Sequence, residues 1–245
     1  MTTQSRIEWT ERTWNPVVGC TKISPGCKNC YAETMARRLK AIGAPGYENG
    51  FRLTQLPSRL GDPLRRGKPT TYFVNSMSDL FHEKVSDSYI AQVLGVVEST
   101  PQHTYQVLTK RAERMATYFA AGCPIPSNAW MGVSVENRRH DLPRIDHLRR
   151  VPARVRFLSV EPLLEQLGLV DLSGIHWVIV GGESGPRARR MLLEWVEGIR
   201  RQCEEQGVAF FFKQWGMWGP DGVRRSKKVN GRELQGRTWD DVPAI

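Results

Sequence analysis

The chain has 245 residues, and its 35 Lys and Arg outnumber 25 Asp and Glu to give a formal net charge of +10. This length fits one large or two small domains, and the excess of cations favours a polyanionic partner such as DNA or RNA. No apolar run is long enough for a signal peptide or a membrane span, so we expect a cytoplasmic protein without membrane contact. The odd number of cysteines, five, argues against a disulfide framework and favours metal binding.

The first predicted strand, residues 14–18, leads directly into a cysteine-rich loop. Pro16 restricts this strand to a short or edge position, because proline cannot donate to a sheet. Apolar residues then recur at helical spacing over residues 31–42, and Gly43 ends the run. Residues 43–70 are rich in Gly, Pro and Arg and show little periodicity, so we expect a long basic loop that is either functional or a simple surface excursion.

From residue 71 onward the sequence alternates between apolar runs of strand length and amphipathic helices. Strands are predicted at residues 71–74, 104–108, 129–135, 155–160, 175–180 and 208–212. The helix after the first of these places Ile90, Val93, Leu94 and Val97 on one face. Cys203 lies on the apolar face of a later helix, so we assign it to the core and not to a metal site.

Six or seven strand-then-helix units predict a parallel sheet covered on both faces. A doubly wound open sheet fits this pattern too, but its phosphate-binding glycine motif is missing after the first strand. Polar residues lie just past the carboxyl ends of the predicted strands: Ser76, Asp79, Lys110, Glu136, Glu161, Glu183 and Lys213. Such ends converge on one face of a TIM-type barrel. We therefore predict a partial (β/α)6-7 barrel over residues 1–215, open on one side, with residues 216–245 as a basic and aromatic tail packed on it.

Three cysteines in the loop after the first strand point to a metal centre. Cys20, Cys27 and Cys30 have the spacing C-x6-C-x2-C, and the last pair can converge on one ion or cluster. A structural zinc site needs four protein ligands, yet no Cys or His follows until His82. Three thiols with an open position therefore favour a reactive iron-sulfur cluster over zinc.

A three-cysteine loop ahead of a partial β/α barrel resembles the radical S-adenosylmethionine superfamily, although the first gap here has six residues where three are usual there. Further segments are similar to a phage-borne and bacterial three-Cys-motif family of unassigned function placed beside that superfamily: residues 19–32, 75–82, 159–162, 181–185 and 213–216. The Cys-Tyr-Ala at residues 30–32 also resembles spore photoproduct lyase, a radical enzyme that repairs thymine lesions.

The resemblance implies that Cys20, Cys27 and Cys30 hold a 4Fe-4S cluster whose open iron binds S-adenosylmethionine. Reduction by an external electron donor then yields a 5′-deoxyadenosyl radical that abstracts hydrogen from the substrate. Candidate cofactor-binding residues are Ser76, Ser78 and Asp79 for the ribose and amino group, Lys110 or Lys213 for the carboxylate, the strand-end carboxylates Glu136 and Glu161, and Gly181, Gly182 and Glu183 for close backbone approach and hydrogen bonding. Structural ion pairs across the barrel mouth are the alternative role for these side chains.

Three functions remain open at this point. The first is a radical S-adenosylmethionine enzyme that modifies or repairs a nucleic acid base. The second is a non-catalytic nucleic-acid-binding protein stabilised by zinc or a cluster, and the third is a radical enzyme acting on a protein or small molecule. Tryptophans among the cations of the tail fit either base stacking or packing of the tail on the domain.

Overall fold

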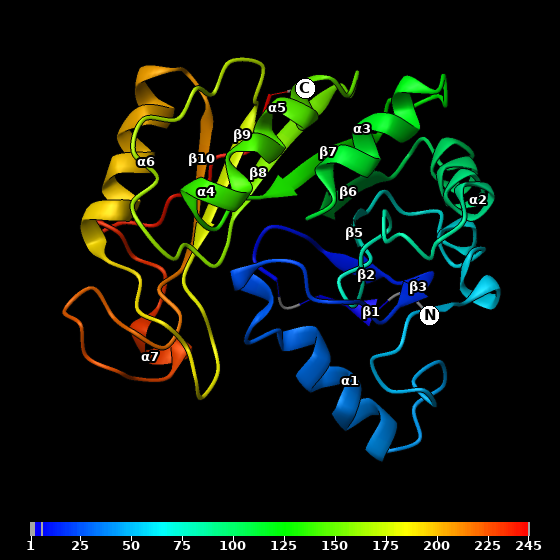
Figure 1. Ribbon diagram of the computed structural model, residues 1–245, viewed down its shortest axis with the longest axis horizontal. Helices are drawn as coiled ribbons and strands as arrows, with labels where there is room; N and C mark the ends of the chain where they lie inside the picture. Colours follow the sequence, from blue (N-terminus) through cyan, green and yellow to red (C-terminus); the bar gives the residue numbers. More distant parts are fainter. Residues whose placement is uncertain (1–2, 6, 245) are drawn as a thin grey trace.

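The computed structural model describes residues 3–5 and 7–244 of the chain and centres on one eight-stranded sheet (Figure 1). Its strands follow one another across the sheet in the order β1 (Thr3–Gln4), β2 (Arg12–Trp14), β5 (Thr71–Val74), β6 (Thr104–Thr109), β7 (Ala129–Ser134), β8 (Val155–Val160), β9 (Trp177–Gly181) and β10 (Ala209–Gln214). β1 is antiparallel to β2, and every other neighbouring pair in this sheet is parallel. The predicted α/β fold with parallel strands is confirmed.

The sheet curls into a partial barrel. Trp9, just before β2, packs against Phe73 of β5 with ring centroids 4.7 Å apart and against Trp177 of β9 at 6.2 Å. Strands from both halves of the sheet therefore meet inside it. Within the described residues β10 pairs with β9 and with no strand at the β1 end, so the barrel stays open on that side.

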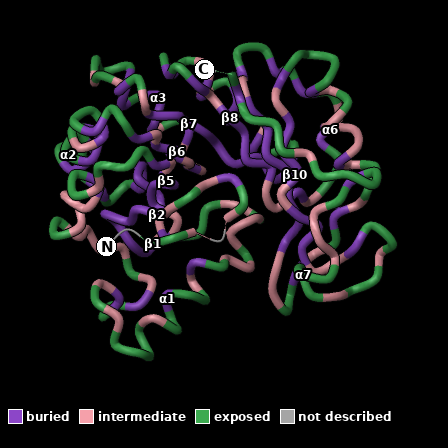
Figure 2. Tube along the Cα trace, turned by 180° about the vertical axis from the view of Figure 1, so that it is seen from behind, coloured by how far each residue is buried: buried purple, intermediate pink, exposed green. Residues whose placement is uncertain are grey.

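Side chains alternate between the inside of the barrel and the layer of helices around it. An aromatic cluster fills the inside near the amino ends of the strands: Trp9, Phe73, Trp130, Phe157, Trp177 and Phe211. We call this cluster the aromatic floor. The intervening residues Tyr72, Val74, Val178 and Val180 face outward into the larger core under the helices, and the buried strands form the centre of Figure 2.

Helices cover the outer face of the sheet (Figure 1). Those on this face are α2 (Asp87–Glu98), α3 (Ala112–Ala120), α4 (Arg138–Asp141), α5 (Pro143–Arg149) and α6 (Leu193–Glu205). The helix α1 (Tyr31–Ala41) instead packs on the cluster around Val18, and α7 (Lys227–Asn230) lies away from the sheet with no buried residue. The predicted apolar face of α2 is buried as expected, and so is Cys203 on α6. None of the helices in the described ranges is both long and apolar enough to span a bilayer.

The amino-terminal region differs from its prediction in two ways. The expected strand over residues 14–18 is divided, because the chain leaves the barrel sheet after Trp14, and β3 (Val17–Val18) pairs antiparallel with β4 (Thr54–Gln55) in a separate two-stranded sheet. Residues 43–70 are thus not a structureless loop. They contain β4 and two 3-10 helices, Pro57–Arg59 and Pro63–Arg65.

The carboxyl-terminal segment runs along the free edge of β10. Phe211 forms an antiparallel bridge with Asp240, and the Phe212 amide donates to the carbonyl of Trp239 at 2.9 Å. The indole of Trp177 donates to the carbonyl of Asp241 at 2.8 Å. These bonds attach the tail to the barrel, while the division at residue 216 stays a prediction.

Candidate active site

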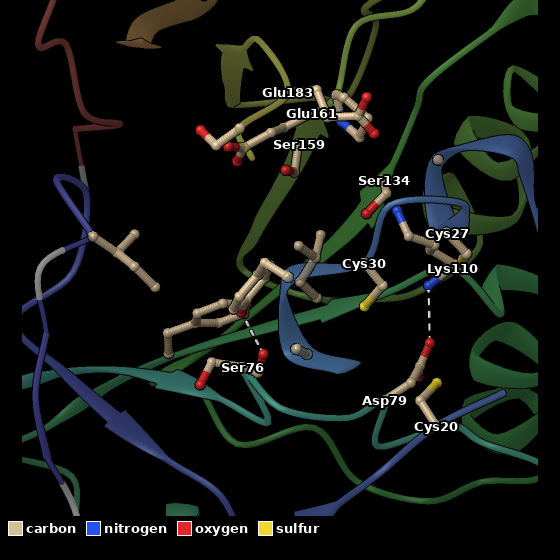
Figure 3. A pocket seen from close by; sticks show the side chains of 18 of the residues that line it. Cys20, Cys27, Cys30, Ser76, Asp79, Lys110, Ser134, Ser159, Glu161 and Glu183 are labelled. Atoms are coloured by element: carbon tan, nitrogen blue, oxygen red, sulfur yellow. Dashed lines mark hydrogen bonds between the residues drawn. The ribbon is translucent and has the colours of Figure 1, made fainter. Parts of the chain in front are cut away.

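A cavity of about 410 Å³ opens at the carboxyl ends of the strands, where the sequence places its polar residues. Figure 3 shows side chains of the cysteine loop and of several strand ends around it. Eleven of the thirteen predicted site residues line the cavity: Cys20, Cys27, Cys30, Ser76, Ser78, Asp79, Lys110, Glu161, Gly182, Glu183 and Lys213. The structure thus brings together residues that are almost 200 positions apart in the sequence.

The other two predicted residues, Glu136 and Gly181, lie behind the cavity wall. Glu136 is completely buried beneath the cysteine loop. Gly181 ends β9, and a Cβ there would lie 3.3 Å from the Glu161 carboxylate. Both positions lie next to residues that line the cavity: Lys110 and Gly26 beside Glu136, and Glu161 beside Gly181.

Glu136 holds the middle of the cysteine loop. Its carboxylate accepts hydrogen bonds from the Ser24 hydroxyl at 2.8 Å and the Gly26 amide at 2.9 Å, and it forms an ion pair with Lys110. A Cβ on Gly26 would lie 2.1 Å from the carboxylate carbon, so only glycine allows this approach. Burial opposes ionisation of Glu136, but the Lys110 ammonium and the hydrogen bonds outweigh it and lower its pKa.

Glu183 holds the end of the same loop. It accepts a hydrogen bond from the Asn29 amide group at 3.1 Å and pairs with the Arg189 guanidinium at 2.6 Å. Arg189 in turn donates to the Pro25 carbonyl at 3.0 Å. Burial would raise the pKa of Glu183, yet the hydrogen bonds from Arg189 and Asn29 lower it, so this carboxylate is ionised at neutral pH.

Arg111 and Asp79 hold the beginning of the loop. The Arg111 guanidinium lies 3.2 Å from Asp79, donates to the Thr21 hydroxyl at 2.8 Å and reaches the Cys20 sulfur at 3.5 Å. Asp79 also accepts from the Thr109 hydroxyl at 2.7 Å, which ties the contact to the end of β6. Three carboxylates from three different strand ends therefore position one cysteine loop.

The far wall of the cavity carries a second lysine–glutamate pair. The Lys213 ammonium lies 2.7 Å from both oxygens of Glu161, joining the ends of β10 and β8. Together with Lys110 and Glu136, this gives two ion pairs at the barrel mouth. Each lysine therefore already has a carboxylate partner, which is the alternative role that the sequence left open.

Three polar atoms in residues that line the cavity have no hydrogen-bond partner within the described part of the chain. They are Asn75 Nδ2, Gln214 Oε1 and Trp9 Nε1. The other amide atoms of Asn75 and Gln214 are engaged, since Asn75 Oδ1 accepts from the Val17 amide and Gln214 Nε2 donates to the Gly182 carbonyl. Buried polar groups are normally paired, so these three buried atoms are exceptions within the cavity wall.

The three thiols line the cavity, but they are not gathered tightly. In the residues that the structure describes, no group of three or more His, Cys, Asp or Glu side chains is arranged to hold a metal ion. Burial, reinforced by the nearby Asp79 carboxylate, raises the pKa of the Cys20 thiol to about 11. A bound metal or cluster must displace this proton, and the ligand role of the three cysteines stays a prediction.

Comparison with known proteins places the chain in a family. A family model described as "Protein of unknown function (DUF5131)" matches residues 4–243. The chain belongs to this family. A search of curated proteins finds no match.

Solved structures of spore photoproduct lyase are similar in fold. One point mutant of that enzyme has a TM-score of 0.53 at 13% identity, covering 93% of this chain and 72% of its own. A second, with dinucleoside spore photoproduct, has a TM-score of 0.51 at 14% identity and covers 84% of this chain and 64% of its own. The lyase complexed with the same dinucleoside has a TM-score of 0.48, and the chain again spans only 64% of it. At this identity the likeness establishes the fold alone, and membership in the three-Cys-motif family stays a prediction.

Several residues of the DUF5131 site escaped the sequence analysis. Arg111 and Arg189 donate to Cys20 and to the Pro25 carbonyl of the cysteine loop. Within the loop, Asn29 donates to Glu183 and Ser24 donates to Glu136. Arg111 directly follows Lys110 at a predicted strand end, so its position was a usable signal. Arg189 lies six residues beyond Glu183, in a loop whose path the sequence does not define.

Proposed function

We propose that this DUF5131 protein is a radical S-adenosylmethionine enzyme that modifies or repairs a nucleic acid base. The observation that carries the proposal is the single cavity onto which Cys20, Cys27 and Cys30 open beside polar strand ends. No other cysteine lines this cavity in the described ranges, since Cys203 is buried in the core and Cys123 packs elsewhere. The candidate metal ligands are therefore three thiols that border the open space of the cavity.

This donor set fits an iron-sulfur cluster better than a zinc ion. Thiolates are the preferred ligands of such clusters, and a closed zinc site requires a fourth protein ligand. When bound, a 4Fe-4S cluster with S-adenosylmethionine would supply one-electron chemistry for abstracting hydrogen from a substrate.

The protein's own residues would hold and orient these groups. The cysteine loop is fixed by Glu136, Glu183 and Arg111, so its thiols keep their place at the cavity edge. Ser76 and Ser78 lie at the end of β5 and would face the ribose and amino group of the cofactor. The lower part of the cavity ends on the apolar side chains of Trp9 and Phe73, against which a planar base would pack.

The substrate class rests on two further points. The chain carries a net charge of +10, which favours a polyanion. The spore photoproduct lyase structure of similar fold contains a dinucleoside spore photoproduct. A non-catalytic nucleic-acid-binding protein stabilised by zinc or a cluster is the competing function. A radical enzyme acting on a protein or small molecule is the third.

The deciding experiment is anaerobic reconstitution with iron and sulfide, followed by reduction in the presence of S-adenosylmethionine. We expect bound iron with cluster absorbance, and 5′-deoxyadenosine by mass spectrometry. Cys27→Ala should lose most of the iron, because the remaining two thiols cannot hold a cluster.

The matched control is Cys123→Ala, which removes a thiol outside the cavity and should leave the iron content unchanged. Retention of zinc alone, with no 5′-deoxyadenosine from the wild-type protein, would sink the enzymatic proposal in favour of the zinc-stabilised binding protein. Equal iron loss in both variants would remove the assignment of the cysteine loop.

A further inference from the structure

Two segments that are distant in the sequence form a projecting lobe beside the cavity. We define the basic lobe as residues 185–190 together with residues 216–232, which include α7 (Figure 1, lower left). The indole of Trp218 donates to the Ala188 carbonyl at 2.8 Å, and Arg224 donates to the Pro186 carbonyl. The Arg190 guanidinium packs against Gly222. The two segments therefore form one surface.

The basic lobe is strongly and unevenly charged. Its sequence contains eight Lys and Arg residues and a single acidic residue, Asp221. Four of its exposed cations have no ion pair with any described residue: Arg187, Arg190, Arg224 and Lys228. On α6, by contrast, Arg200 pairs with both Glu197 and Glu204. Unneutralised like charges repel one another, so the lobe presents a surface that an anion would stabilise.

The basic lobe continues into the cavity. Lys227 of α7 lines the cavity and lies 3.7 Å from Glu8, which lines it from the other side of the barrel opening. Arg189 of the lobe pairs with Glu183 at the cavity wall. A ligand that lies along the lobe therefore has its nearest end at the cavity opening.

We propose that the basic lobe binds the phosphate backbone of a nucleic acid strand and directs one of its bases into the cavity. Six of the eight cations are arginines, whose planar guanidinium groups match phosphate oxygens better than a lysine ammonium does. The strand must be single or locally opened, because a base stacked inside a duplex cannot enter the cavity. The inference rests on the proposed function for the meaning of the cavity, but the binding itself needs no cluster.

The test is binding of the reconstituted protein to a fluorescent mixed-sequence DNA strand of about 16 nucleotides over a range of salt concentrations. The double variant Arg187→Gln/Lys228→Gln removes two exposed side chains that make no hydrogen bond or ion pair with the described residues. Each lost phosphate contact lowers the slope of log affinity against log salt by about 0.7. We expect a slope smaller by about 1.4 and, near 0.1 M salt, about 25-fold weaker binding.

The control is Lys68→Gln/Arg154→Gln. Both residues are exposed and precede β5 and β8, so they lie at the opposite ends of the strands and the net charge falls by the same amount. This variant should bind nearly as tightly as wild type. Equal losses in the two double variants, or no loss in either, would overturn the basic lobe as the docking surface. Circular dichroism of both variants checks that they are folded.

Two further arms separate the remaining interpretations. An RNA strand of the same sequence distinguishes the source of the phosphates, and lobe-dependent binding of either strand supports the proposal. A labelled oligo-glutamate of equal charge that binds as tightly as DNA, and loses binding in the lobe variant, would instead assign the lobe to an acidic protein. Absence of 5′-deoxyadenosine with lobe-dependent DNA binding would refute the enzymatic function and leave the lobe intact.

Discussion

The two ends of the barrel are built on opposite principles. Near the amino ends of the strands, the aromatic floor packs rings against one another, as in the edge-on contact of Trp177 with Phe211 at 5.9 Å. At the carboxyl ends, charged side chains surround a cavity and hold the cysteine loop. We call this end, with the cavity and the cysteine loop, the mouth. Only Trp9 and Phe73 belong to both regions, because they form the lower wall of the cavity.

This difference shows that the residues that contribute most to stability and the residues of the candidate site lie largely at different ends of the barrel. The floor excludes water and contributes apolar burial, whereas the mouth contributes directional bonds whose net effect on stability is smaller. Changes in the floor should therefore unfold the protein, and changes in the mouth should release the cysteine loop from a folded barrel.

The largest effect is expected for Trp177→Ala in the floor. Trp177 is completely buried, and removing such a side chain leaves a cavity that costs about 3–5 kcal/mol. Urea unfolding followed by circular dichroism measures the loss. A loss below about 1 kcal/mol would show that the floor does not carry the fold.

An intermediate effect is expected for Glu136→Gln in the mouth. The amide keeps the volume but removes the charge opposite Lys110 and mismatches the donors of Ser24 and Gly26, which should cost about 2 kcal/mol. The alkylation rate of Cys27 in the metal-free protein should rise at the same time, because the loop is no longer held. Glu98→Gln, on the exposed face of α2, is the control, and an unchanged alkylation rate would contradict the role of Glu136 as a clamp.

Acid should act mainly on the mouth. The pKa values of Glu136 and Glu183 lie below the ordinary value of 4.5 in the folded protein. Their contribution to stability is therefore present above that value and is lost as the pH falls through the lower folded pKa. The urea midpoint should decrease below pH 4.5, and Glu183→Gln should show a flatter decrease. If the urea midpoint of this variant decreases as steeply as that of the wild type, Glu183 does not contribute to the loss of stability in acid.

The smallest effect is expected for Trp9→Phe, where floor and mouth meet. The Trp9 indole nitrogen is buried and has no hydrogen-bond partner among the described residues. Removing this unpaired N–H relieves the cost of burying it, and this gain offsets part of the stability lost with the smaller side chain. The free energy of unfolding should therefore change by about 1 kcal/mol or less. Trp177→Phe is the matched comparison, because it breaks the 2.8 Å bond to Asp241 and should cost more. A reversed order would show that the Trp9 indole nitrogen is satisfied.

The sequence predicts the barrel and most residues of its mouth, but not which side chains pair with one another there. Strand periodicity places Lys110, Glu161 and Lys213 at strand ends, and parallel strands bring those ends together. Which partner each side chain takes depends on the shear and curl of the sheet, which no local pattern encodes. Glu136 was therefore expected to bind a cofactor, whereas its described contacts are with the cysteine loop and Lys110.

The division of the predicted first strand has a similar cause. Residues 17 and 18 look like a continuation of β2, but their partner is β4, which lies in a segment without strand periodicity. A two-residue strand carries too weak a signal to be found from sequence. Long-range pairing decided this part of the fold.

The bridge between Phe211 and Asp240 has a consequence for handling the protein. An unclosed barrel leaves a row of backbone donors and acceptors along its last strand, and such an edge recruits strands from other molecules. Here residues 239 and 240 occupy part of that row on β10. Residues 239 and 240 thus cover part of an edge that would otherwise be open to strands of other molecules. Their removal should increase self-association.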